Sequence, residues 1–235
     1  MPLTAVAPGL WSYVHTMHAP GGVRMPVRMN LARVGASRDG ASGDLWVHSP
    51  VPIDDALAAE IAGLGRVLYV VAPNAYHHLF AGTFAARFPG AKLYGVSGVT
   101  RKRPELAFEG MLTDGSVPPW AGEIDQVFIE GAPKLSEVVF FHRASRSLLV
   151  SDLFFNVTEP ETWMTGLVLR MMGTYKRFGR SRAWSLFGKD RSLLKASVEK
   201  VLAWDFVRVL PAHGVPFETA ETRADTRTAA AWFLE

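Results

Sequence analysis

The sequence of 235 residues contains no cysteine. This absence excludes disulfides, zinc–thiolate sites and cysteine nucleophiles together. A metal would therefore have to be held by histidine, aspartate, glutamate or asparagine. No apolar run reaches the roughly 18 residues of a membrane-spanning helix, because Gly, Pro or charged residues interrupt each run earlier. Residues 1–10 also lack the basic region and apolar stretch of a signal peptide, so we expect a cytoplasmic protein.

Charge is modest and nearly balanced. Charged residues make up 20% of the chain and hydrophobic residues 49%, which is a globular rather than a disordered composition. The formal net charge is only +3, so the total charge does not indicate a nucleic-acid partner. A chain of this length can bury a sizeable core, and no repeat or linker divides it. We therefore expect one domain over residues 1–235, and the sequence leaves its oligomeric state open.

Hydrophobic patterning predicts an antiparallel opening followed by alternating strands and helices. Apolar residues alternate from Val23 to Leu31, which is typical of a half-buried strand. A Gly- and Ser-rich hairpin loop is predicted at residues 35–43. Strands are predicted at 11–18, 23–33, 44–48, 66–72, 92–96, 126–129, 137–141, 147–150 and 206–210, and helical segments at 53–63, 79–88, 157–195, 192–204 and 221–234. This order predicts mixed α/β layers.

Four predicted strands end at side chains that can bind a metal. These side chains are His48, the pair His77 and His78, Asp152, and His213. Strand ends gather at one edge of a layered α/β fold, so residues far apart in sequence can converge there. Each histidine alone has a second interpretation as a hydrogen-bonded structural residue, and Asp152 alone could cap the residues that follow. Together they offer an ordinary ligand set for zinc or iron.

These residues lie in segments that resemble the metallo-β-lactamase-fold superfamily. The segments read LWVHSP, APNAYHHLF, FFHRASRSLLVSDLFFN and LPAHG, and the resemblance covers roughly residues 11–218. They look closer still to an uncharacterised family of that fold. The resemblance implies a four-layer αββα sandwich of the metallo-β-lactamase type.

The resemblance also assigns candidate ligands. The superfamily's loop after the third major strand reads His-x-His-x-Asp-His, and residues 73–78 stand there as Pro-Asn-Ala-Tyr-His-His. His78 matches the last histidine, and His77 stands where the aspartate would be. Asp152 matches the aspartate that bridges two metals, and His213 matches the C-terminal histidine.

The resemblance implies that the first of the superfamily's two metal sites is missing. Pro73 and Ala75 stand at two of its histidines, and residues 131–136 hold no histidine at the place of the third. The remaining ligands overlap the second site and are His77, His78, Asp152 and His213. We therefore expect at most one divalent metal, zinc before iron or manganese, with a metal-free protein as the alternative.

Strand pairing adds a further acidic residue. Folding the two strands about a turn at residues 144–145 places Glu137 opposite Asp152. Glu137 either supplies an oxygen ligand or a general base, or it is a solvated strand residue. The same register puts His142 at the far turn, where we expect a structural role.

A basic and aromatic stretch, residues 170–195, precedes the last predicted strand. One interpretation is a helical surface that packs on the core. The other is a helical cover over the His/Asp edge, at about residues 158–190. Its methionine and aromatic side chains would suit an apolar ligand body, and Arg170, Lys176 and Arg177 would hold an anionic end. The partner would then be an anionic or amphipathic small molecule, since no base-reading motif indicates nucleic acid.

The resemblance implies a hydrolase in which a metal-polarised water or hydroxide attacks an ester, amide or phosphoester. Asp152 would be a ligand or orient the nucleophile, and Glu137 is the other catalytic candidate. His48 and Asn74 would support the ligands from behind. The rival hypothesis is a metal-free, inactive member that binds a ligand or a protein. The sequence does not identify the substrate.

Overall fold

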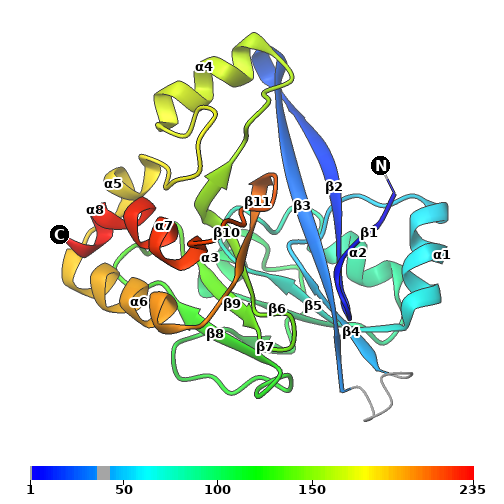
Figure 1. Ribbon diagram of the computed structural model, residues 1–235. Coiled ribbons are helices and arrows are strands. Elements are labelled where there is room, and N and C mark those ends of the chain that lie inside the picture. Colours follow the sequence, from blue (N-terminus) through cyan, green and yellow to red (C-terminus); the bar gives the residue numbers. More distant parts are fainter. Residues whose placement is uncertain (1, 36–42) are drawn as a thin grey trace.

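The computed structural model describes residues 2–35 and 43–235, so the loop predicted at 35–43 lies mostly outside the described residues. The chain forms two stacked β-sheets (Figure 1). The first has the order β1-β2-β3-β4-β5-β6-β7, with strands Thr4–Ala7, Leu10–Ala19, Val23–Val34, Asp44–His48, Arg66–Ala72, Lys92–Gly95 and Gly110–Met111. The second has the order β11-β10-β9-β8, with β8 Ile124–Phe128, β9 Val138–His142, β10 Ser147–Asn156 and β11 Arg208–Gly214.

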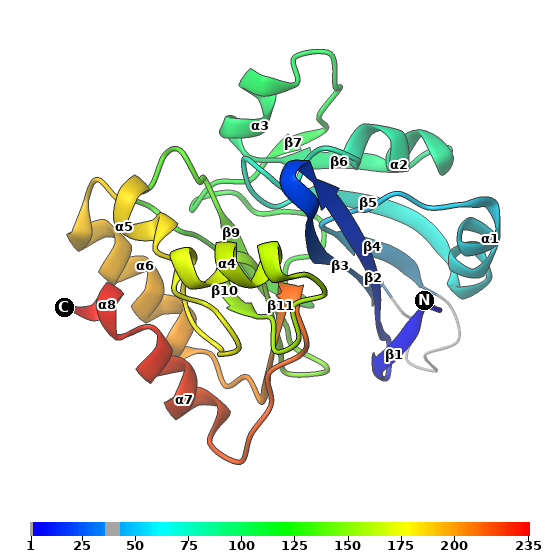
Figure 2. The same cartoon turned by 90° about the horizontal axis from the view of Figure 1, so that it is seen from above.

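Most helices lie on the two outer sides of the sheets (Figure 2), whereas α4 (Trp163–Met172) lies at their upper edge in Figure 1. The helices α1 (Asp55–Leu64) and α2 (Ala81–Arg87) contact β5, while α6 (Arg191–Ala203) contacts β8 and α8 (Ala231–Leu234). The remaining helices are α3 Ser97–Lys102, α4 Trp163–Met172, α5 Ala183–Phe187 and α7 Thr222–Ala229. This layering confirms the predicted αββα sandwich of the metallo-β-lactamase type.

Two apolar cores hold the layers together. The core between the sheets contains Trp46 and Phe140, and the core between the second sheet and the C-terminal helices contains Phe141 and Val198. Phe140 and Phe141 enter different cores because successive strand residues point to opposite faces. Burial on both faces explains why the central strands are nearly continuous apolar runs.

The predicted pairing of β9 with β10 is confirmed. Ser147 pairs with His142 and Leu149 pairs with Phe140, the register of a turn centred on residues 144–145. His142 is buried at this turn, where its Nδ1 atom lies 2.7 Å from the Ser145 hydroxyl. It lies at the opposite end of β9 from Glu137, as the register predicts.

The segment at residues 157–195 is less helical than predicted. It contains the separate helices α4 and α5 before α6 begins. Gly173 ends α4 in the left-handed conformation, with φ of 76°, which glycine adopts without steric cost. Gly179 then pairs with Phe155 beside β10, so the chain between the helices is extended rather than helical. Within the described part of the chain, no helix combines the length and apolar character needed to cross a membrane.

Candidate metal site

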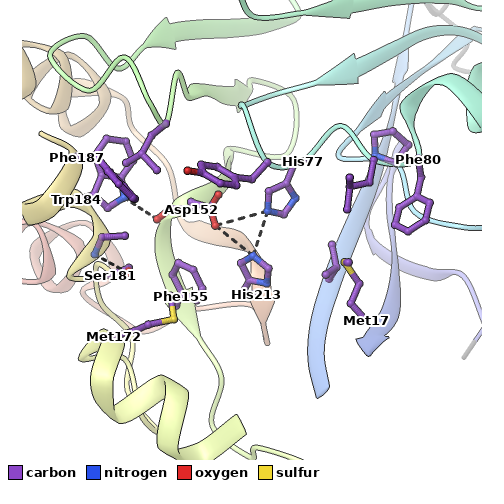
Figure 3. Close-up of a pocket in the computed structure, with 16 residues that line it drawn as sticks. Met17, His77, Phe80, Asp152, Phe155, Met172, Ser181, Trp184, Phe187 and His213 are labelled. Carbon is purple, nitrogen blue, oxygen red and sulfur yellow. Dashed lines mark hydrogen bonds and ion pairs between the residues drawn. The ribbon is translucent and has the colours of Figure 1, made fainter. Parts of the chain in front are cut away.

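Three side chains from distant parts of the chain converge at one edge of the sandwich (Figure 3). His77 lies in the loop after β5, Asp152 on β10 and His213 on β11. The His77 and His213 Nε2 atoms are 3.2 Å apart, and the Asp152 Oδ1 atom lies 3.7 Å and 3.3 Å from them, respectively. Among the described residues, this is the one group of three or more potential ligand residues whose ligand atoms all lie within 4.8 Å of each other.

A bulge in β10 carries Asp152. Val150 pairs with Pro211 and Phe155 pairs with His213, so residues 151–154 face only one residue of β11. Bulges of this kind redirect side chains and are common beside active sites. The Trp184 indole N–H donates to the main-chain oxygen of Asp152 at 2.8 Å, which fixes the bulge from the side of α5.

Asn74 connects the loop after β5 to Asp152. Its side-chain oxygen accepts from the main-chain N–H groups of Tyr76 and His77, at 2.9 and 2.7 Å, which makes a compact turn of the kind that Asn favours. Its side-chain N–H donates to Asp152 Oδ2 at 2.7 Å. The Asn74 side chain therefore positions both His77 and Asp152, and it leaves Asp152 Oδ1 facing the two histidines.

The outer nitrogen of each histidine is held by a partner. His213 Nδ1 lies 2.9 Å from the Pro26 carbonyl oxygen, which can only accept, so this nitrogen carries a proton. In the neutral ring the lone pair is then on Nε2 and points at the group. His77 Nδ1 lies 2.7 Å from the Ser49 hydroxyl, which can accept in the same way. Such partners orient histidine ligands in metal sites.

The three separations fit a metal ion. A tetrahedral zinc site with bonds of about 2.0–2.1 Å has ligand atoms about 3.3–3.4 Å apart. The observed separations of 3.2, 3.3 and 3.7 Å bracket that value. Two neutral imidazoles whose lone pairs both face each other at this distance repel, unless a cation or a shared proton lies between them.

Electrostatics favours an ionised Asp152. Burial alone would raise the pKa of this carboxyl, but His77 and His213, when they also carry a proton on Nε2, lower it below its usual range through their charges and hydrogen bonds. The group therefore offers one carboxylate and two imidazoles, the donor types that bind zinc and iron.

Glu137 lies behind the site rather than in it. Its side chain is fully buried, so the alternative of a solvated strand residue is wrong. It accepts hydrogen bonds from the main-chain N–H groups of residues 151, 152 and 153 at 2.9–3.1 Å and braces the bulge. Burial and the nearby Asp152 charge raise its pKa, and these three N–H groups oppose that rise. Because a substrate cannot reach it there, its expected role as a catalytic base must be corrected to a supporting one.

The structure places His77, and not its neighbour His78, beside Asp152 and His213. His78 is buried on another side of the loop, where burial and then the charges of Lys102 and Arg103 lower its pKa. Adjacent residues of a turn point in different directions, so the pair cannot both reach one point. The expected fourth ligand must therefore be corrected.

His48 is also enclosed rather than bonded to the site. It is fully buried, stacks on Trp46 and meets the edge of Phe140. Neither ring nitrogen has a hydrogen-bond partner among the described residues. Contact with His77 is made instead by the next residue, Ser49.

A cavity of about 490 Å³ opens beside the three side chains (Figure 3). This volume lies within the range of small-molecule sites. One wall comes from the first sheet and its loops, and its side chains include Met17, Val27, Pro50, Tyr76, Leu79 and Phe80. The opposite wall includes Leu135, Phe155, Met172, Ala183, Trp184 and Phe187. The segment at 158–190 therefore supplies part of the cavity.

The basic side chains of that segment face elsewhere. The Arg170 guanidinium stacks 3.6 Å from the centre of the Tyr175 ring, and Arg177 donates to the Gly173 carbonyl at 2.7 Å. Neither these residues nor Lys176 line the cavity. The expectation that they hold an anionic end of the ligand must be corrected.

Sequence reasoning missed Ser49 and Pro26, and it placed Trp184 among the aromatic residues of the cover without its hydrogen bond to Asp152. Pro26 acts through its carbonyl, which every residue possesses, and Trp184 is one of seven tryptophans, so neither carries a local signal. Ser49 did carry a local signal, because its hydroxyl directly follows the strand-end residue His48 and so lies at the predicted edge.

Comparisons with known proteins agree with this fold. The profile of a family described as "Domain of unknown function (DUF4336)" matches residues 10–169. No curated protein matches the chain. Among solved structures, a metallo-β-lactamase from Hirschia baltica is 12% identical, with a TM-score of 0.65 over 100% of this chain and 98% of that one.

Two further structures show the same fold. The mono-zinc form of the metallo-β-lactamase FIM-1 from Pseudomonas aeruginosa is 15% identical, with a TM-score of 0.62 over 99% of this chain and 96% of that one. A metal-soaked flavodiiron core, Flv1 from Synechocystis sp. PCC6803, is 11% identical, with a TM-score of 0.63 over 98% of this chain and 60% of that one. At these identities the likeness establishes the fold.

Proposed function

Since the chain belongs to the family "Domain of unknown function (DUF4336)" and has the metallo-β-lactamase fold, we propose that it is a hydrolase that uses a single divalent metal, with zinc as the first choice. His77, Asp152 and His213 would hold the metal. The observation that carries the proposal is the spacing of their ligand atoms, at 3.2, 3.3 and 3.7 Å. A bound metal would supply Lewis-acid activation of a water molecule and of an ester, amide or phosphoester.

The chain's own residues would prepare the site. Pro26 and Ser49 fix the ring orientations of the two histidines, and Asn74 fixes Asp152. The apolar cavity would orient the substrate and exclude bulk water, which strengthens electrostatic interactions around the three polar side chains. One site rather than two is expected because Pro73 and Ala75 offer no side-chain donor.

We further propose that residues 1–235 form one domain in which the segment at about 158–190 acts as a partial cover. Both sheets contribute to one shared core, which supports a single folding unit. Met172 and Trp184 of the segment line the cavity, which supports the cover. Other apolar side chains of the segment pack against the protein rather than line the cavity. Phe178, for example, stacks on Phe217 with ring centres 3.8 Å apart.

The test is metal analysis of untagged protein purified without chelators, together with ester hydrolysis. We expect one metal per chain, and we expect hydrolysis that a chelator abolishes and zinc restores. His77→Ala and His213→Ala should lose the metal and the activity together. As a control, His142→Ala alters a buried histidine away from the site and should keep both.

A second candidate is a metal-free binding protein. One observation favours it: the 3.2 Å separation of the two Nε2 atoms also fits a hydrogen bond with one shared proton. A folded protein without metal after zinc titration would support this candidate and contradict the hydrolase.

A further inference from the structure

We infer that the cavity selects an uncharged compound with an apolar body and a single carbonyl group, such as an alkyl ester or amide, rather than an anionic substrate. The inference deepens the proposed function and rests on it. It concerns the chemistry of the cavity wall, which the metal ligands alone do not determine.

The wall is apolar on both sides. Val27 and Phe80 from one side face Leu135, Phe155 and Trp184 from the other. Burying a methylene group against such a wall is favourable, by about fourfold in affinity for each group added. Met17 and Met172 also line the cavity, and their flexible side chains can adapt to ligand bodies of different shape.

Three polar side chains lie together between the two apolar walls (Figure 3). They are His77, Asp152 and His213, and among the described residues no Lys, Arg or Glu side chain lines the cavity. The wall also carries the hydroxyl groups of Tyr76 and Ser181, and the Ser181 hydroxyl accepts from the main-chain N–H of Ala183 at 3.1 Å. An anionic group on the apolar wall would therefore lose its water without gaining a cation.

Two lysines contact aromatic residues of the wall without lining the cavity themselves. Lys102 Nζ lies 4.3 Å from the centre of the Tyr76 ring and donates to the Ala75 carbonyl at 2.6 Å. Lys134 Nζ lies 5.6 Å from the centre of the Phe187 ring. Tyr76 and Phe187 line the cavity and the two lysines do not, so these cations contact the rim aromatics instead of the cavity interior.

The test compares neutral and acid-ended compounds of matched length on the 235-residue chain as purified. Calorimetric titration with 2-alkanones of six to twelve carbons measures binding without hydrolysis. p-Nitrophenyl alkanoates and the corresponding mono-p-nitrophenyl dicarboxylates measure kcat/KM, with the added charge far from the reacting ester. We expect ketone affinity to rise about fourfold per methylene until the cavity is full. We also expect neutral esters to exceed the acid-ended ones at least tenfold.

Two neighbouring methionines provide matched variants. Met172 lines the cavity, whereas Met171 is 68% exposed and does not. Met172→Lys should weaken ketone binding at least tenfold and shift the preference toward acid-ended esters, while Met171→Lys should change neither. Leu79→Lys, at a position that is 51% exposed at the mouth, repeats the test where folding tolerates a charge.

The outcomes separate this inference from the proposed function. Metal binding and hydrolysis without chain-length dependence, or with faster acid-ended esters, would overturn the inference and leave the proposed function standing. Chain-length-dependent ketone binding in a protein that holds no metal and hydrolyses no ester would overturn the proposed function but support the selectivity of the cavity. Equal effects of Met172→Lys and Met171→Lys would also overturn the inference.

Discussion

Replacing His48 by glutamine should remove much of the acid sensitivity of the fold. Complete burial, and then the charge of His77, lower the pKa of His48 from 6.5 to about 3. The folded ring therefore stays neutral while the ring in the unfolded chain binds a proton below about pH 6.5. Stability from the neutral ring is complete above that pH and is lost as the pH falls toward 3. At pH 4.5, two units lower, the loss is about 2–3 kcal/mol at about 1.4 kcal/mol per unit.

The assay is urea unfolding at pH 7.5 and 4.5, followed by tryptophan fluorescence with chelator present. Glutamine changes packing and hydrogen bonding equally at both pH values, so the difference between the two pH values isolates the protonation. Between pH 7.5 and pH 4.5, the free energy of unfolding of His48→Gln should fall by about 2–3 kcal/mol less than that of the unsubstituted protein. His142→Gln should act in the same direction, because burial lowers the pKa of His142 to about 4. Parallel losses in His48→Gln and the unsubstituted protein would show that water reaches the His48 ring and would refute the reasoning.

Three other perturbations test the supports of the site. Trp184→Phe removes the 2.8 Å bond to the Asp152 carbonyl and should lower the free energy of unfolding by about 1–3 kcal/mol, whereas Trp163→Phe, at a position that is 76% exposed, should change it by less than about 0.5 kcal/mol. Asn74→Ala should weaken zinc binding ten- to a hundredfold in a competition titration with a chelating dye, and unchanged affinity would contradict its positioning role. With chelator present, the unsubstituted protein should lose stability as the pH falls below about 4, and Asp152→Asn should not show this loss. His77 and His213 lower the pKa of Asp152, so its charge stabilises the fold above about pH 4 and this stabilisation is lost at lower pH. If both proteins lose stability equally there, the ion pairing is not stabilising.

Much of the layered fold could be predicted from the sequence, because its signals are local. The pairing of β9 with β10 follows from one turn, and the turn is marked by the polar residues between two apolar strands. Apolar runs such as residues 66–72 predict strands that are buried on both faces. The segment at 157–195 could not be predicted in the same way. Its helical pattern continues past Gly173, where the left-handed conformation of a single residue ends α4.

The candidate site was predictable only in part. Strand ends bring His213 and Asp152 to one edge, and the alternation of strands and helices predicts this. The choice between His77 and His78 depends on the turn that the Asn74 side chain closes, which a ligand-spacing argument cannot resolve. The role of Glu137 depends on burial, and a strand residue next to a buried bulge has the same sequence pattern as a solvated one. Position along the chain therefore identifies the edge, while hydrogen bonds decide which side chains face it.

X-ray absorption spectroscopy at the zinc edge, on protein loaded with one equivalent of zinc, tests the central claim most directly. The spacing of His77, Asp152 and His213 predicts one zinc per chain with two imidazole nitrogens and one carboxylate oxygen, at about 2.0–2.2 Å. His77→Ala should lose specific zinc binding, and His78→Ala should keep both imidazole contributions. Two fully occupied zinc ions, a ligand set that includes His78, or no specific zinc binding would contradict the account.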